Sequence, residues 1–275
     1  MKILVAGCSH IFGTDLKDCD GITSSKLTWP MLLFPNATNI SKPGASPNTI
    51  ARRVLMYLSY NLPKPIDGVI VQWPNLNRWE SVSPDFDMTG EDWPYQTIGQ
   101  HESHQYNDKA TLAWKMHIAG TDLYNVHIQN VQTIIMLNSI LRLKKIKCVN
   151  LLSNPISTDK RLQPNQQNTI SKPKRFSIGD LKRWGFWNAI HSGLCHSFGI
   201  NTSTDADIKV ADDDVFERVL MNELSLYKWL DLDGMSWTEW ASHNNYQTTN
   251  WHYSEQAHVD ASKLLEKKIG NIFET

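Results

Sequence analysis

An apolar run that stops at a glycine opens the chain and places the strongest constraint on its fold. Residues 3–6 are continuously apolar, and Gly7-Cys8-Ser9 follows at once. A continuous apolar run, without polar alternation, is typical of a strand covered on both faces in a parallel sheet. We therefore predict a buried first strand over residues 2–7, followed by a sharp turn.

Strand-like and helix-like segments alternate along the rest of the chain. Further strands are predicted over residues 36–41, 67–73 and 147–153. Helices are predicted over residues 47–62, 121–146, 212–230 and 254–269, with residues 177–199 mostly helical. Such alternation implies a parallel sheet with helices on both faces. The predicted fold class is α/β, a three-layer α/β/α sandwich around a central parallel sheet.

The chain length and one irregular segment define the predicted domain organisation. A length of 275 residues is sufficient for one large domain. Between about residues 80 and 120 the sequence is polar and rich in aromatics, and it follows neither period. We predict a single α/β domain over residues 1–275, with a lid or insertion at about 80–120.

Composition argues against several partners. The net charge of −1 gives no electrostatic reason to expect nucleic acid or an anionic membrane. No apolar stretch approaches the ~20 residues of a membrane-spanning helix. The four cysteines form no CxxC pair, and the N-terminus lacks the apolar region of a signal peptide. These features predict a cytoplasmic protein with no nucleic-acid or membrane partner.

Residue types suited to ester cleavage follow the predicted strands. Ser9 follows the first strand, Gly44 the second and Asn75 the third, while His252 precedes the last helix. Ligands of open parallel sheets bind beyond the carboxyl ends of the strands. A serine nucleophile needs a base and preorganised donors for the oxyanion. We predict Ser9 as nucleophile, His252 as base, and the N–H groups of Ser9 and Gly44, with the Asn75 amide, as oxyanion hole.

The order of these features resembles that of the SGNH/GDSL hydrolases, and more narrowly the SGNH-like proteins of bacteriophages and marine bacteria. The stretches GCSHIFG, PGASPNTIAR, VIVQWPNLNRWE and HYSEQAHVDASKLL carry the resemblance. It implies a flavodoxin-like sandwich and a metal-independent esterase or deacetylase without a cofactor. The substrate class would be a small-molecule or glycan ester. The eleven tryptophans are compatible with a sugar-stacking groove.

The chain departs from that family at the acid that orients the histidine. Thr249 stands where the family carries an aspartate, and Cys8 replaces another. Asp231 and Asp233 are the predicted candidates for the missing acid, and a Ser–His dyad is the alternative. The same departure motivates a second function, a catalytically inactive binding or structural module such as a phage particle component. That protein would be associated with the virion.

Plainer interpretations stand beside these hypotheses. Ser9 and Asn75 are also ordinary turn residues, and Gly44 an ordinary turn glycine. His10 is predicted to be structural or pocket-lining. The ten histidines invite a metal site, but no zinc spacing with a second half is found. No metal site is predicted among the candidate ligands His101, His104, His117, His191, Cys195 and His196.

Overall fold

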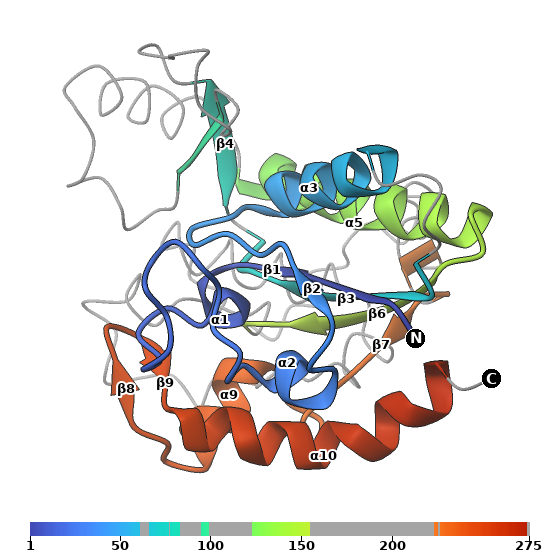
Figure 1. The fold of residues 1–275 in the computed structure, drawn as a ribbon. Coiled ribbons are helices and arrows are strands. Elements are labelled where there is room, and N and C mark those ends of the chain that lie inside the picture. The colour runs from blue at the N-terminus through green and yellow to red at the C-terminus, as the bar shows by residue number, and fades with distance from the viewer. Residues whose placement is uncertain are drawn as a thin grey trace, which may run out of the picture.

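A five-stranded parallel sheet lies at the centre of the molecule, with strand order β2-β1-β3-β6-β7 (Figure 1). The computed structural model describes residues 1–60, 66–76, 78–82, 95–98, 123–154, 223–224 and 226–273. The strands are β1 (Ile3–Gly7), β2 (Thr38–Asn39), β3 (Gly68–Trp73), β6 (Lys147–Leu152) and β7 (Lys228–Trp229). Every pairing is parallel, so the predicted parallel sheet is confirmed.

Helices cover both faces of the sheet. Successive side chains of a strand point to opposite faces of the sheet. Leu4 and Ala6 of β1 therefore belong to one core cluster, and Ile3 and Val5 belong to the other. The helices α3 (Pro47–Tyr60) and α5 (Leu123–Leu143) pack on the first face. The opposite face is covered by α2 (Trp29–Leu33), α9 (Trp237–His243) and α10 (Glu255–Phe273). The three-layer sandwich is confirmed.

The fifth strand replaces the end of a predicted helix. Residues 228–229 form β7 instead of closing the helix expected over residues 212–230. The Leu230 N–H donates to the Asn150 carbonyl oxygen at 2.7 Å. Pairing with the open edge of β6 satisfies backbone groups there, and this tertiary gain outweighs the local helical pattern. Residues 177–199 and 212–222 lie outside the described residues.

The predicted insertion begins with a two-stranded hairpin. The strands β4 (Trp79–Val82) and β5 (Tyr95–Ile98) pair antiparallel, and Figure 1 shows β4 extending away from the central sheet. The remainder of residues 80–120 lies outside the described residues. The prediction of a single domain with a lid therefore stays a prediction.

Helix α10 ends directly on the bare Cα of Gly68 at the start of β3. A Cβ at this position would lie 2.1 Å from Cε1 of the Phe273 ring. A methyl group here would force the buried ring out of its place. The absence of a side chain at Gly68 therefore sets how closely α10 approaches the sheet.

We expect Gly68→Ala to lower the free energy of unfolding by about 1–3 kcal/mol, because overpacking strains its neighbours. In a Phe273→Ala background the same change should cost less than about 1 kcal/mol. Chemical denaturation of all four proteins completes the double-mutant cycle. The control is Gly270→Ala, where a Cβ meets no described atom, and which should stabilise α10 by roughly 1 kcal/mol. Equal costs of Gly68→Ala in both backgrounds would contradict this account.

Candidate functional site

The predicted site residues lie where the strand order reverses. β1 is flanked by β2 and β3, so chain connections leave β1 and β3 in opposite directions. Such a switch point leaves a crevice at the carboxyl ends of the strands. Ser9 follows β1, Gly44 follows β2 and Asn75 follows β3. Figure 1 shows α1 (Ser9–Phe12) and the hairpin of β8 (Thr248–Thr249) and β9 (His252–Tyr253) at this same end.

The turn after β1 has two positions that only glycine fills. A Cβ on Gly7 would lie 2.9 Å from the Ile11 side chain, and one on Gly13 would lie 2.4 Å from the Ser25 Cβ. Gly13 also has φ +80°, a conformation that suits glycine. The two glycines therefore allow the chain to leave β1, form one helical turn and stop.

Ser9 is the first residue of that turn. Cys8 precedes it in an extended conformation, and its carbonyl oxygen accepts the N–H groups of Ile11 and Phe12. The Cys8 side chain is buried, whereas Ser9 is partly exposed. The turn therefore presents Ser9 at the carboxyl end of β1.

His252 comes from a hairpin that reaches the same turn. Strands β8 (Thr248–Thr249) and β9 (His252–Tyr253) pair antiparallel, with Thr249 opposite His252. The connecting residues Asn250 and Trp251 have φ of +45° and +72°, as in the type I′ turns that suit hairpins. β9 contacts α1, which brings the base candidate close to the nucleophile candidate. No hydrogen bond joins Ser9 to His252 among the described residues.

The carboxylate hydrogen-bonded to the His252 ring belongs to Asp15, which was not among the predicted site residues. Nδ1 of His252 lies 2.8 Å from Oδ2 of Asp15, and the two side chains are 18% and 26% exposed. Asp15 follows the turn that ends α1 and has φ +69°. Nothing in the local pattern marks Asp15, because its partner lies 237 residues away.

Neither of the two predicted acids is hydrogen-bonded to His252 in the described residues. Oδ1 of Asp231 accepts the Lys268 ammonium at 3.0 Å and the Gly234 N–H at 2.8 Å. Asp233 is exposed, with φ +52°, in the turn between the bridged residues Leu232 and Met235. The acid at His252 is therefore Asp15 and neither of these two, because the β8–β9 hairpin folds toward α1.

His10 packs against the base candidate. Its ring lies edge-on to His252 with 5.4 Å between centroids, and stacks on Tyr253 at 6.4 Å. Burial lowers the pKa of His10 to about 3, and the charges of His252, His258 and Arg78 add to this. Its Nδ1 is buried without a hydrogen-bond partner in the described part of the chain. His10 is therefore an uncharged side chain that packs against His252.

Gly44 and Asn75 lie on neighbouring turns. Gly44 has φ +73°, and a Cβ there would meet no described atom within 4 Å. The Lys42 N–H donates to the Gly7 carbonyl oxygen at 3.1 Å, which ties this turn to the end of β1. The Arg78 guanidinium donates to the Ala45 carbonyl oxygen at 3.1 Å, linking the turn after β3 to the turn after β2.

A buried polar chain lies below Ser9. The Trp29 indole donates to the Gln72 side-chain oxygen at 2.8 Å, and the Gln72 amide donates to the Ser153 hydroxyl at 3.0 Å. That hydroxyl lies 3.8 Å from the Cys8 sulfur. Satisfied buried polar groups rigidify their surroundings. Gln72 is the one polar residue in the apolar strand over residues 68–73, and this was the available signal in the sequence.

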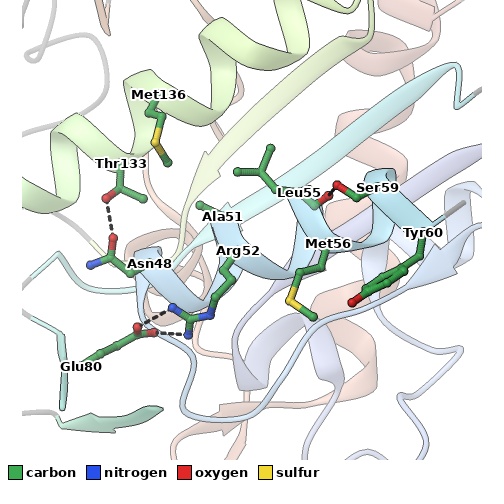
Figure 2. Close-up of a pocket in the computed structure, with 10 residues that line it drawn as sticks. All are labelled: Asn48, Ala51, Arg52, Leu55, Met56, Ser59, Tyr60, Glu80, Thr133 and Met136. Atoms are coloured by element: carbon green, nitrogen blue, oxygen red, sulfur yellow. Dashed lines mark hydrogen bonds and ion pairs between the residues drawn. The ribbon is translucent and has the colours of Figure 1, made fainter. Parts of the chain in front are cut away.

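A groove lies between α3 and α5, beside the base of the β4–β5 hairpin. It encloses about 580 Å³ (Figure 2). At its edge the Arg52 guanidinium contacts both Glu80 oxygens at 2.9 and 3.3 Å, and the Ser46 hydroxyl donates to Glu80 at 2.6 Å. Burial alone would raise the pKa of Glu80, but the bonds from Arg52, Ser46 and Thr49 outweigh it and lower that pKa. These contacts join β4 to Ser46, which lies two residues after Gly44 in the sequence.

Comparisons with known proteins give similarity to solved esterase and lipase structures. One is TesA, at 11% identity over 99% of both chains, with a TM-score of 0.47. Another is the psychrotrophic esterase EstA from Pseudoalteromonas sp., at 9% identity over 100% of this chain and 99% of that chain, with a TM-score of 0.48. A catalytic mutant of Axe2, an acetylxylan esterase from Geobacillus stearothermophilus, is 10% identical over 98% and 94% of the chains, with a TM-score of 0.44.

No family profile and no curated protein sequence matches the chain. Similar solved structures also include a member of the lipolytic protein G-D-S-L family from Veillonella parvula and a lipase/acylhydrolase from Enterococcus faecalis, at 11% and 12% identity with TM-scores of 0.40 and 0.42. Any functional conclusion therefore depends on the chain's own residues.

Two further features concern partners and ligands. Among the described residues, no helix is both long and apolar enough to cross a membrane. In the same part of the chain, no three potential ligand side chains gather as a metal site would require. The metal candidates between residues 101 and 117 and between 191 and 196 lie outside the described residues.

His258 gives this region a pH-dependent stability. Its Nδ1 accepts the Trp29 N–H at 3.2 Å, and its ring stacks on Trp237. Burial, followed by the charge of His252, lowers its pKa from 6.5 to about 3. At pH values between these two, His258 is protonated in the unfolded chain but not in the folded chain. The free energy of unfolding therefore falls as the pH drops through that range.

We expect the proton uptake of His258 to lower the free energy of unfolding by about 2 kcal/mol when the pH falls from 7.5 to 5. His258→Asn, whose amide oxygen can accept the Trp29 N–H, should remove that part of the pH dependence. Chemical denaturation at both pH values measures it. The control His243→Asn, at an exposed position of α9, should retain the parental pH dependence. An unchanged pH dependence in His258→Asn would refute this origin.

Proposed function

We propose that the chain is a serine hydrolase of SGNH type that cleaves carboxylic esters. The observation that carries the proposal is the convergence of two distant segments at the carboxyl end of β1. One presents Ser9, and the other presents His252 with its Nδ1 already hydrogen-bonded. A carboxylate at Nδ1 leaves Nε2 of the neutral ring as the proton acceptor.

The first half-reaction forms an acyl-enzyme. The Ser9 hydroxyl oxygen attacks the ester carbonyl carbon, and its proton passes to Nε2 of His252. The oxyanion accepts hydrogen bonds from the N–H groups of Ser9 and Gly44 and from the Asn75 side-chain amide. When the carbonyl re-forms, the ester C–O bond breaks and the alcohol leaves with the proton from His252.

The second half-reaction restores the serine. Water loses a proton to His252 and attacks the acyl carbon, and the bond to Ser9 breaks as the serine regains that proton. The products are a carboxylic acid and an alcohol. Both catalytic groups are side chains of the protein, so the scheme requires no metal and no cofactor.

The substrate class we propose is a small-molecule or glycan ester, with O-acetylated sugars foremost. Glu80 at the base of the β4–β5 hairpin binds Ser46, two residues from Gly44, and Arg52 of α3, and these contacts support a role for the insertion in substrate binding. The sequence from residue 79 to residue 114 is rich in tryptophan and tyrosine. Aromatic faces of this kind stack on sugar rings.

A fluorophosphonate probe tests the proposed nucleophile. We expect one covalent adduct per chain, located on Ser9 by peptide mass spectrometry and absent from Ser9→Ala. The variant should also lose at least about 1,000-fold in kcat on an aryl acetate. His252→Gln should slow labelling by about 100-fold or more, because the general base is lost.

The matched control is Ser59→Ala, which removes an exposed serine of α3. It should label and turn over like the parent protein. Acetate release from an O-acetylated oligosaccharide then tests the sugar substrate. An unlabelled parent protein without turnover would favour the inactive binding module, which Thr249 first suggested.

A further inference from the structure

We infer that Asp15 is the positioning residue for His252, a role that was predicted for Asp231 or Asp233. The inference rests on the proposed function, since it names the residue that prepares the proposed base. Asp15 acts through His252 and does not contact the reacting atoms. The segment from the start of α1 to just beyond its end thus supplies both the nucleophile, Ser9, and the acid, Asp15, six residues apart.

The hydrogen bond between Asp15 and His252 fixes the tautomer. An ionised carboxylate only accepts hydrogen bonds, so the 2.8 Å contact between Oδ2 and Nδ1 requires the proton on Nδ1. The His252 side chain is 18% exposed and the Asp15 side chain 26%, although Asp15 as a whole residue is exposed. At 2.8 Å the negative carboxylate also stabilises the imidazolium that forms when Ser9 is deprotonated.

Both oxygens of Asp15 face the hairpin. Oδ1 lies 3.5 Å from the Asn250 side-chain nitrogen, which approaches from the turn between β8 and β9. Two residues beyond Asp15, the Lys17 ammonium binds Glu255 of α10 at 2.7 Å. The segment after α1 is therefore joined to the hairpin and to α10 at successive positions, and the Asp15 carboxylate is held in place.

The backbone around this contact adopts rare conformations. Asp15, Asn250 and Trp251 all have left-handed φ, at +69°, +45° and +72°. Asp and Asn tolerate this region, whereas a bulky residue such as tryptophan is a clear outlier there. Strained residues gather where a function requires a specific geometry. Residues with left-handed φ therefore lie on both sides of one hydrogen bond, and Trp251 is the outlier among them.

Neighbouring acids have other partners. The Asp260 carboxylate accepts Tyr246 and Gln256 side chains, and Glu255 binds Lys17. On the hairpin itself, Thr249 lies directly across from His252 in the ladder and is exposed. Side chains of opposed residues in an antiparallel pair share one face. An aspartate at position 249 would therefore approach the His252 ring from the neighbouring strand, β8.

Kinetics of Asp15→Asn test the inference. We expect kcat on an aryl acetate to fall by about 100- to 10,000-fold, as when the acid of a Ser–His–Asp triad becomes an amide. KM should stay within about threefold, because Asp15 does not touch the substrate. The control is Glu266→Gln, which removes an exposed negative charge from α10 and should leave both constants unchanged.

Relocation of the acid provides a sharper test. Asp15→Asn/Thr249→Asp should recover at least about tenfold in kcat over Asp15→Asn. The matched double variant Asp15→Asn/Thr249→Asn, which has the same shape without the charge, should recover nothing. A full kcat in Asp15→Asn, or equal activity of the two double variants, overturns the inference.

Ring-nitrogen NMR of ¹⁵N-histidine-labelled parent protein separates this inference from the proposed function. We expect the resonance assigned through His252→Gln to report a proton on Nδ1 of the neutral ring, whether or not the protein turns over an ester. A proton on Nε2 overturns the role of Asp15 even if Ser9 labels. An unlabelled protein with Nδ1 protonated refutes the hydrolase and leaves the Asp15 contact intact.

Discussion

The close packing around two glycines at the end of β1 is the constraint on which the rest of the structure depends. Gly7 has no room for a Cβ against Ile11 and the Gln72 carbonyl, and Gly13 adopts a left-handed conformation against Ser25. Only this pair of glycines lets the chain leave the sheet, make a single helical turn and reverse. Ser9 and Asp15 owe their positions on either side of that turn to the same sterics.

A second constraint is the burial of β1 and β3 on both faces. With helices on either side, the strands expose polar groups to ligands only at their carboxyl ends. Gln72 enters the core at this end and is satisfied by Trp29 and Ser153. The floor of the site is therefore rigid, while its walls come from loops and from a hairpin near the C-terminus.

Prediction from sequence succeeded where the pattern was local. The apolar run over residues 3–6 indicated β1, and the helical spacing over residues 47–62 indicated α3. It failed at β7, whose two residues form a strand only because the edge of β6 is open beside them. It also missed the short helices and the β8–β9 hairpin, which are too brief to show a period.

The sequence by itself determined the α/β class, the helical layers and the place of Ser9 after the first strand. It could do so because the apolar patterns that indicate burial, and the residue types that indicate turns, involve residues close together in the sequence. The partner of His252 was decided only by the tertiary structure. Asp15 and His252 are far apart along the chain, and Asp231, nearer in sequence, binds Lys268 instead. Which carboxylate meets an imidazole depends on how two turns pack, and no local pattern records that packing.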